Sequence, residues 1–390
     1  MQYIFRTFNV GAGDCITLLL KNNNKELHIM VDCGSYTPEV NEYIVHDFHC
    51  HIDYLIVSHI DNDHVLGLIS MLSSLPNLSI SHVLYNCYQR TCDDLKEWDD
   101  KMKKNVERVY GHLPVVLDLL DAKVNAETSK TLAELILQNV AWKNAWDRNY
   151  ITSETKPMEL ENNMGRLMFL SPTKTELDIL DAKYRKLFWN TLYKKKEEDY
   201  KKEETIYEAL MRIMAEEHHN PILEKTSAII LNGETIKMFA DECLGNLTPE
   251  NKASIAFVWE HENHRILFCG DAAPDILFSK LEEAYEDCPK PIIFDIIKVA
   301  HHGSAHSVSK EQMNVADSSR YFVTGGSSNR PSYQALSRII TASLPTNISY
   351  REIRFNRENA VLKDFANDKT LKEKYHYAII SDTNEYEISY

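Results

Sequence analysis

The sequence predicts an α/β protein in which two β-rich halves flank a largely helical insertion. Short apolar runs, separated by glycines and turn residues, occupy residues 1–90 and return after residue 225. Between them, apolar residues recur at spacings of three and four, the period of an amphipathic helix. We therefore expect an N-terminal half over 1–90, an insertion over 91–224 with a strand near 160–170, and a C-terminal half with a tail over 225–390.

The N-terminal half is expected to alternate strands with helices. Apolar and β-branched residues between turn residues predict its strands, with Asn22-Asn23-Asn24 as one turn. The run Ile52-Asp53-Tyr54-Leu55-Ile56-Val57 is apolar enough for a buried strand. The expected strands are 3–10, 15–20, 27–31, 52–57 and 82–87, and the expected helices are 38–48 and 65–75.

The insertion is expected to be helical because apolar stripes repeat along it. A run of mixed charges over 194–199 follows the last stripe, and it fits either a solvated helix face or a nucleic-acid contact. The stripes are Leu95, Trp98, Met102, Val106 and Val109, then Leu132, Leu135, Ile136 and Val140, then Leu177, Leu180, Tyr184, Leu187 and Phe188.

The C-terminal half is expected to return to strands that end in loops, followed by alternating helices and strands. The expected strands are 228–231, 254–260, 265–269, 294–300, 320–324, 375–380 and 385–390, and the expected helices lie near 308–317 and 331–344.

The composition is that of an ordinary globular protein with an acidic balance. The chain has 390 residues, of which 44% are hydrophobic and 26% charged, and its formal net charge is −15. This charge argues against tight, nonspecific coating of nucleic acid. It still allows a nuclease, because bound metal ions would supply positive charge at the site itself.

Cysteine usage and hydropathy indicate a cytoplasmic location. The eight cysteines include no C-x-x-C pair, and several lie in apolar strand contexts, so we expect buried free thiols rather than disulfides. No apolar stretch approaches the ~18 residues that span a membrane, and the N-terminus does not have the pattern of a signal peptide. We expect no contact with a membrane.

One short loop contains four potential metal ligands in six residues. His59, Asp61, Asp63 and His64 directly follow the expected strand 52–57. A divalent cation needs such convergence, because each ligand must lie about 2.0–2.3 Å from the ion. A solvated acidic turn has no need of this spacing, so the loop predicts a metal site.

Two later strands also end in ligand-type residues. The run 265–269 leads into Gly270-Asp271, and the run 294–300 leads into His301-His302-Gly303-Ser304. Three ligand-bearing loops on separate strands are what a dinuclear centre at a sheet edge requires.

These motifs, in this order, resemble those of metallo-β-lactamase-fold hydrolases. Within that superfamily the chain resembles the branch typified by the hydrolase domain of the DNA-uptake channel protein ComEC. The resemblance covers about residues 1–90 and 225–345. The matching segments are Asn9-Val10-Gly11-Ala12-Gly13-Asp14-Cys15, Val31-Asp32-Cys33-Gly34, 59–64, Asn251-Lys252-Ala253-Ser254-Ile255, Gly270-Asp271 and 298–304.

The resemblance implies a four-layer αβ/βα sandwich and a centre of two divalent ions, Mn²⁺ or Zn²⁺, with Mg²⁺ also allowed. Asp271 would bridge the two ions. The sequence does not distinguish His301 from His302 as the last ligand, and we expect His301. The implied ligands are His59, Asp61, Asp63, His64, Asp271 and His301.

The resemblance also implies roles around the metal ions. Asp63 would orient the attacking water, and His302 would protonate a leaving oxygen or bind the substrate. Ser304 and Arg330 are candidate substrate contacts, although a turn serine and a structural surface arginine explain them equally well. Asp32 would support the ligand loop from behind, or cap a turn.

Four departures from the family pattern bear on the metal and the substrate. Asp61 stands where the superfamily has a histidine, and only His82 and His112 are candidates for the third-motif histidine. Such an oxygen-rich site favours Mn²⁺ or Mg²⁺ over Zn²⁺. The branch's Gly-Gln-Gly-Asp has Ala12 in second place, and its Gly-His-Pro is replaced by Ser328-Asn329-Arg330-Pro331.

These inferences converge on a metal-dependent hydrolase. We expect a phosphodiesterase or nuclease that acts on DNA through a hydroxide activated by two metal ions. The alternatives are a hydrolase of a small molecule (a cyclic nucleotide, a phosphoester, or a carboxylic ester or lactone) and a subunit that is active only with a partner protein. The helical insertion would be the surface that such a partner binds.

Overall fold

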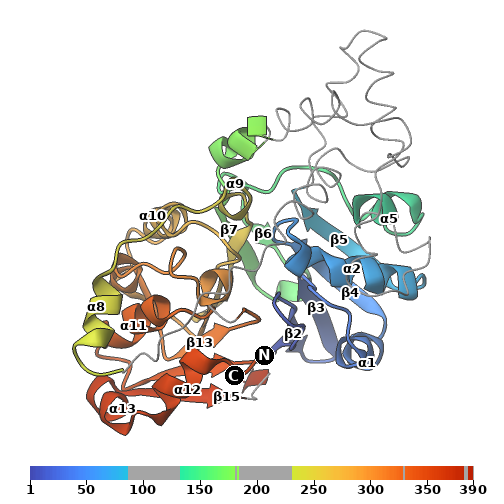
Figure 1. Cartoon of the computed structure of the whole chain (residues 1–390). Helices are drawn as coiled ribbons and strands as arrows, with labels where there is room; N and C mark the ends of the chain where they lie inside the picture. The colour runs from blue at the N-terminus through green and yellow to red at the C-terminus, as the bar shows by residue number, and fades with distance from the viewer. Residues whose placement is uncertain (87–131, 181, 184–230, 328–329, 382–384, 390) are drawn as a thin grey trace, which may run out of the picture.

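The computed structural model describes residues 1–86, 132–180, 182–183, 231–327, 330–381 and 385–389. Within these residues the chain forms two large mixed sheets that lie face to face, with helices on their outer sides (Figure 1). The N-terminal segments, drawn in blue, build one half, and the yellow to red segments build the other. The first and last strands of the chain lie side by side in the first sheet.

The first sheet has the strand order β16-β1-β2-β3-β4-β5. Its N-terminal strands pair antiparallel, whereas β3, β4 and β5 run parallel. Parallel strands place their carboxyl ends at the same edge, so the loops after β3 and β4 begin side by side. The strands are β1 (Gln2–Thr7), β2 (Ile16–Asn22), β3 (Lys25–Val31), β4 (His51–Val57), β5 (Ser79–Tyr85) and β16 (Glu385–Ser389).

Three helices cover the outer face of the first sheet: α1 (Pro38–His46), α2 (Asn62–Ser74) and α5 (Leu132–Gln138). Helix α1 begins with Thr37, whose hydroxyl accepts the backbone N–H of Val40. Apolar residues of these helices and of the outer sheet face form one continuous buried core. Burial of this face holds the helices on the sheet.

The second sheet has the order β15-β14-β13-β11-β9-β8-β7-β6, and a small parallel sheet pairs β10 with β12. Strands β9, β11, β13, β14 and β15 run parallel. The strands are β6 (Met158–Glu159), β7 (Arg166–Ser171), β8 (Ala256–His261), β9 (His264–Phe268), β10 (Ile292–Phe294), β11 (Ile296–Lys298), β12 (Ala316–Ser318), β13 (Arg320–Val323), β14 (Arg351–Phe355) and β15 (Tyr377–Ser381).

The helices of the second half lie mainly on the outer face of this sheet (Figure 1), where they share a second buried core. They are α8 (Thr235–Asp241), α10 (Pro274–Ala284), α11 (Tyr333–Thr341), α12 (Ala360–Asn367) and α13 (Lys369–Tyr375). The short helix α9 (Pro249–Lys252) lies just before β8 and is not part of this core. Short 3₁₀ turns lie at Glu161–Asn163, Ala300–Gly303 and Glu311–Asn314.

A third core, formed by side chains of both sheets, lies between them. Phe5 of the first sheet packs edge-on against Phe322 of the second, with ring centroids 4.7 Å apart. Tyr3 likewise packs against Trp259 at 5.2 Å. With helices outside both sheets, this core completes the predicted four-layer αβ/βα arrangement.

Several predicted elements need correction. The helix expected at 65–75 begins earlier, at Asn62, so Asp63 and His64 lie in its first turn. The helix expected near 308–317 is wrong: the chain makes only the turn Glu311–Asn314 and then enters β12, because Ala316 pairs with Ile292 of β10. Strand β14 and helices α8, α9, α10, α12 and α13 were not predicted.

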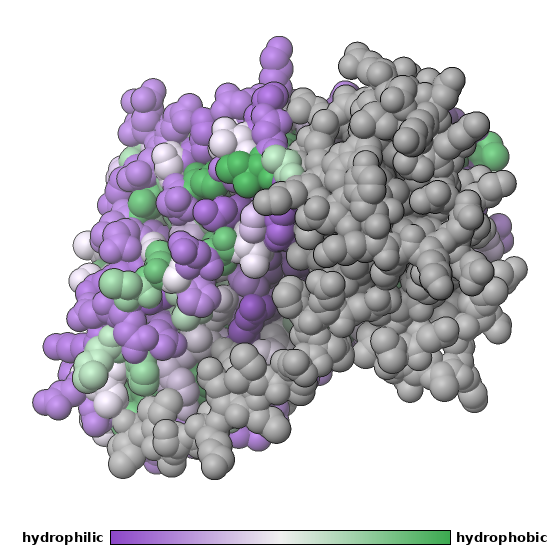
Figure 2. Space-filling view, turned by 45° about the horizontal axis from the view of Figure 1, so that its top comes forward, coloured by the Kyte–Doolittle hydropathy of each residue, from purple (hydrophilic) through white to green (hydrophobic). Residues whose placement is uncertain are grey.

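Much of the predicted insertion lies outside the described residues, including the first apolar stripe, the charged run 194–199 and His112. Within the described part, the strand expected near 160–170 is β7, which pairs with β8 of the second sheet. No helix in the described segments has both the length and the apolar character needed to cross a bilayer. Outside the grey areas, the face in Figure 2 is mostly hydrophilic, with apolar side chains in small groups.

Candidate metal centre

The ligand loop follows β4, at the edge where the parallel strands of both sheets end. Asp61 is the N-cap residue of α2, with extended backbone angles, and the chain then turns directly into the helix. The Gly-rich loop before β2 packs against this turn: Asp14 N–H donates to Asp63 O at 3.2 Å. A Cβ on Gly13 would lie 1.6 Å from Asp63 O, so only glycine allows this approach.

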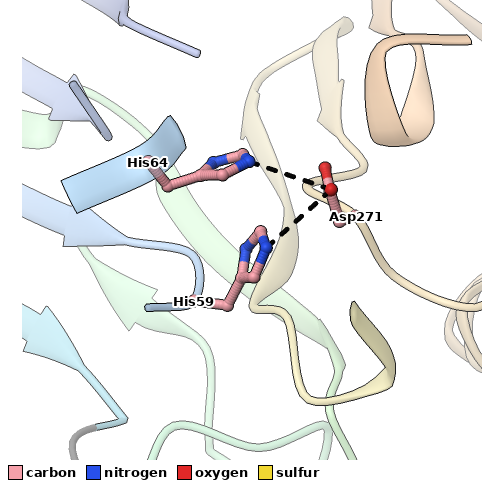
Figure 3. Close-up of side chains that lie close together, drawn as sticks. All are labelled: His59, His64 and Asp271. Carbon is pink, nitrogen blue, oxygen red and sulfur yellow. Dashed lines mark ion pairs between the residues drawn. The ribbon is translucent and has the colours of Figure 1, made fainter. Parts of the chain in front are cut away.

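Two histidine rings of this loop converge on one carboxylate from the other half of the chain (Figure 3). The Nε2 atoms of His59 and His64 each lie 3.8 Å from Asp271 Oδ2. Asp61 Oδ2 lies 3.6 Å from His59 Nε2. The three side chains in Figure 3 form a group whose ligand atoms all lie within 4.8 Å of one another.

A second ligand group adjoins the first through His64. It consists of Asp63, His64 and His302, again with ligand atoms within 4.8 Å. His302 Nε2 lies 3.5 Å from Asp63 Oδ2, and His64 Nε2 lies 3.9 Å from Asp63 Oδ1. His302 Nδ1 donates to the backbone O of Thr324 at 2.9 Å, so Nε2 is the ring nitrogen that is left to bind an ion.

The polar atoms that face this space lack partners in the protein. Within the described chain, five of them are buried without a hydrogen bond: Nε2 of His59, His64 and His302, and Oδ1 of Asp61 and Asp271. Buried polar groups are normally satisfied, so an unpaired cluster of this kind needs an explanation. Imidazole nitrogens and carboxylate oxygens are ligands for divalent cations, so the residues fit a metal centre.

Asp32 supports the ligand loop from behind. Its Oδ2 accepts a hydrogen bond from His64 Nδ1 at 2.8 Å, and its Oδ1 accepts the backbone N–H of Ser58 at 2.7 Å. The hydroxyl of Ser58 donates to Asp32 and lies 3.0 Å from His59 Nδ1. One buried carboxylate therefore orients both imidazoles of the loop.

A buried ion pair lies under His302. Asp14 pairs with Lys298 and accepts a hydrogen bond from Thr324 Oγ1, and its Oδ1 lies 3.3 Å from His302 Nδ1. Asp14 and Lys298 are each 1% exposed. Both residues lie in segments that resemble the family, but no local pattern in the sequence shows that Asp14 and Lys298 pair with each other.

Ser254 and Asn251 are further residues that the sequence analysis left without a function. Ser254 Oγ accepts the backbone N–H of Asp271 at 3.0 Å, which fixes the loop after β9. Asn251 Nδ2 lies 3.1 Å from His301 Nδ1, and Thr248 caps the short helix that holds it. Both residues lie in the segment 251–255, and its resemblance to the family is the sequence signal that could have identified them.

The carboxylates and histidines of the centre shift one another's pKa values. Burial raises the pKa of Asp63, but His64 and His302 outweigh burial and hold it well below its usual range. Burial lowers the pKa of His302, but Asp14 and Asp63 outweigh burial and raise it to about 9. Protons therefore balance the carboxylates of the metal-free protein, and a bound cation would replace them.

His301 occupies a different position from His302. Its Nε2 lies 3.4 Å from Asp271 Oδ2, and its Nδ1 lies 3.0 Å from Ser307 Oγ. Burial lowers the pKa of His301 to about 3 against the pull of Asp271, and the positive charge of Arg330 lowers it further. His302 therefore belongs to the same ligand group as Asp63 and His64. His301 lies beside Asp271, the carboxylate of the first ligand group.

The remaining predicted site residues lie as follows. Ser304 is buried, and its Oγ accepts the backbone N–H of His306 at 3.3 Å, which is a turn-forming contact. His82 stacks on the ring of Tyr54, with centroids 4.8 Å apart. Arg330 is half-buried, and within the described residues its guanidinium makes no ion pair or hydrogen bond.

Comparison with known proteins gives one family. Residues 10–135 match the family model of the metallo-beta-lactamase superfamily. The matched residues include the Gly-rich loop, Asp32 and the whole first ligand loop. No curated protein matches the chain.

Among solved structures, the metallo-beta-lactamase fold protein YhfI from Bacillus subtilis aligns over 99% of this chain and 98% of its own, with 8% identity and a TM-score of 0.37. A diphosphatase from the PhnP family aligns over 100% of this chain and 98% of its own, with 9% identity and a TM-score of 0.37. The metallo-beta-lactamase SMB-1 aligns over 80% and 87%, with 11% identity and a TM-score of 0.26.

Proposed function

We propose that this chain, whose residues 10–135 match the metallo-beta-lactamase superfamily and which has the two-sheet fold, is a metal-dependent phosphodiesterase that cleaves DNA. The observation that carries the hydrolase assignment is the buried cluster of unpaired imidazole nitrogens and carboxylate oxygens at the sheet edge. Buried polar groups are normally paired, and a bound cation would pair these nitrogens and oxygens together.

Two ligand sets are available for two ions. His59, Asp61 and Asp271 would hold one ion, and Asp63, His64 and His302 the other, with Asp271 facing both. Asp14 and Asp32 add further buried negative charge behind the ligands, and Lys298 offsets part of it. This excess of carboxylates favours hard cations such as Mn²⁺ and Mg²⁺, and Zn²⁺ also binds such mixed sites.

Bound divalent ions supply Lewis acidity at a phosphoryl oxygen and lower the pKa of a water. Asp63, in the first turn of α2, would accept a hydrogen bond from that water and fix its direction of attack. With His302 as a ligand, His301 is the imidazole available to contact the leaving oxygen. Asn251 and Ser307 hold the His301 ring in place.

The phosphodiester assignment rests on Arg330. Its guanidinium lies close enough to lower the pKa of His301, and it makes no ion pair with the described residues. A planar guanidinium binds a phosphate through two parallel hydrogen bonds. Arg330 would therefore hold the phosphate next to the scissile one, or the scissile phosphate itself.

The alternative is a small-molecule phosphoester, cyclic nucleotide, carboxylic ester or lactone as substrate, and one observation favours it. The formal net charge is −15, whereas proteins that bind nucleic acid along its backbone usually have a basic surface. A partner protein that brings the DNA would reconcile the acidic chain with a nuclease activity. We propose the segment 91–224 as its binding surface.

The test is a cleavage assay on linear and circular, single- and double-stranded DNA. The chelated protein receives Mn²⁺, Mg²⁺ or Zn²⁺, beside an Asp63→Ala/His64→Ala variant and a matched control, Asp295→Asn. The control carboxylate also faces a histidine, with Oδ2 3.1 Å from His264 Nδ1, but lies away from the centre. Metal-dependent cleavage that only the double variant loses supports the proposal.

The same preparation decides between the alternatives. Turnover of bis-p-nitrophenyl phosphate without DNA cleavage would assign a small phosphodiester as substrate. No turnover of any phosphoester, despite bound metal, would overturn the assignment of a phosphodiesterase that is active alone, and would leave an ester or lactone as substrate or an enzyme that needs its partner. The metal content of single variants separates the two histidines: we expect His302→Ala to lose bound metal and His301→Ala to keep it but lose activity.

A further inference from the structure

A second histidine cluster lies at the opposite end of the first sheet from the candidate metal centre. It consists of Glu26 and His28 near the start of β3, the exposed His49, and His51 and Asp53 at the start of β4. The metal-centre residues Asp32 and His59 follow the other ends of these strands. The two clusters are therefore separated by the length of a strand, roughly 20 Å for seven residues.

His28 is held in one orientation and one tautomer. Its ring stacks on Phe48, with centroids 4.5 Å apart, and its side chain is 6% exposed. Its Nδ1 lies 3.0 Å from the backbone O of His51, which can only accept, so Nδ1 carries the hydrogen. The neutral ring therefore presents an unprotonated Nε2, as metal-ligating histidines with such a backbone contact do.

The Nε2 lone pair of His28 faces a carboxylate. Glu26 Oε2 lies 3.6 Å away, and within the described residues Nε2 is buried without a hydrogen bond. Two electron-rich atoms in this arrangement repel each other unless a proton or a cation lies between them. Burial lowers the pKa of His28 despite Asp53 and Glu26, which works against the proton.

A third potential ligand points to the same oxygen. His49 Nε2 lies 3.9 Å from Glu26 Oε2, and the side chain of His49 is 70% exposed. A tetrahedral ion with metal–ligand distances of about 2.0–2.1 Å separates its ligands by about 3.4 Å. The three atoms are not yet all within 4.8 Å of one another, so binding would require the exposed His49 ring to turn inward.

We propose that Glu26, His28 and His49 bind a second kind of metal ion, a Zn²⁺ in a structural site, with solvent in its fourth position. Two imidazoles and one carboxylate suit Zn²⁺ better than Mg²⁺ or Ca²⁺. Lys21 pairs with Oε1 of Glu26 at 2.8 Å, so Oε2 remains for the ion. The ion would connect β3, which carries Glu26 and His28, to the turn before β4, which carries His49.

The test measures Zn²⁺ content and thermal stability of the full chain. His49→Ala and Glu26→Gln change residues at the surface, so the fold should persist, and His82→Ala serves as the control for losing an exposed histidine of the same sheet. We expect both site variants to bind one fewer Zn²⁺ per chain after dialysis, with affinity for that ion at least about tenfold weaker. The control should keep the wild-type content.

A second measurement separates this site from the hydrolytic centre. In a His59→Ala/His64→Ala background, added Zn²⁺ should still raise the Tm, and further addition of His49→Ala should remove that rise. Equal Zn²⁺ content in the wild type, His49→Ala and Glu26→Gln would overturn the proposal, whatever the hydrolase assay shows. An equal loss in His82→Ala would also overturn it.

Discussion

At the scale of the residue, the centre is built from histidines with one ring nitrogen already bound. His64 donates from Nδ1 to Asp32, and His302 donates from Nδ1 to the backbone of Thr324. Each contact fixes the ring and leaves Nε2 directed at the space shared with Asp271. The supporting residues therefore decide the geometry as much as the ligands do.

Asp32 offers the most direct test of this support. We expect Asp32→Asn to weaken metal binding about 10- to 100-fold, because the amide no longer stabilises the Nδ1–H of His64 as a charged acceptor does. Calorimetric titration with Mn²⁺ and Zn²⁺ measures the effect. Asp295→Asn, which loses a similar carboxylate–histidine contact at His264, should bind metal as the wild type does.

The buried pair of Asp14 and Lys298 predicts a coupling. Either single change leaves the other charge buried, so Asp14→Asn and Lys298→Met should each destabilise the fold, and together cost less than their sum. We expect a coupling free energy of at least about 1 kcal/mol from urea unfolding of the four proteins. Additive effects would show that the two charges do not depend on each other.

The sequence reveals the ligands better than it reveals their supports. His59, Asp61, Asp63 and His64 are adjacent in the chain, so one short motif predicts their proximity, and strand ends predict that Asp271 joins them. Ser254 and Lys298 act through contacts with residues far away in the chain, which no local pattern records. The choice between His301 and His302 likewise depends on the left-handed backbone of both residues.

At the scale of the element, Arg338 of α11 joins segments around the His-His turn. Its buried guanidinium donates to the backbone oxygens of Ala305 and Val308, which follow the turn, and of Glu242, after α8. Its Nε donates to Ala240 O at 3.4 Å. One side chain thus satisfies four carbonyls that no secondary structure pairs.

Replacement of Arg338 should be costly for this reason. Arg338→Met removes several charged hydrogen bonds and leaves buried carbonyls unpaired, so we expect a loss of about 3 kcal/mol or more in the free energy of unfolding. Arg338→Lys should lose less of the free energy of unfolding than Arg338→Met, because an ammonium still pairs with some of these carbonyls. Arg148→Ala, at an exposed arginine, should change stability by less than about 0.5 kcal/mol in the same urea titration.

Strand β14 shows why some elements escape a sequence pattern. Its residues alternate inward and outward, but the inward set includes Arg351, which reads as polar. Arg351 is buried because it forms a bidentate pair with Asp317 of β12, at 3.0 and 2.6 Å. Strands whose inward residues are all apolar, such as β4 and β9, were predicted within a few residues.

At the scale of the whole molecule, β16 connects the two halves. It pairs with β1 in the first sheet, and the ring of its Tyr386 contacts two arginines of the second sheet. The guanidinium carbons of Arg320 and Arg354 lie 4.3 and 5.2 Å from the ring centroid. The two strands predicted at 375–380 and 385–390 therefore belong to different sheets.

Tyr386→Ala should weaken this connection. We expect a loss of about 1–2 kcal/mol in the free energy of unfolding, from the cation–π contacts and the packed ring. Tyr386→Leu, which keeps apolar area without the ring face, should fall between the wild type and Tyr386→Ala. Tyr350→Ala, at a tyrosine that is 46% exposed, should cost less than about 0.5 kcal/mol.

The fact that ligands come from both halves has a kinetic consequence. His64 and Asp271 are more than two hundred residues apart in the chain, so the centre can close only after both halves have formed and docked. Contacts that form after the folding transition state slow unfolding and leave the folding rate nearly unchanged. Added metal should therefore lower the rate of unfolding in denaturant. The rate of refolding should be the same with and without metal, and stopped-flow or manual-mixing experiments measure both rates.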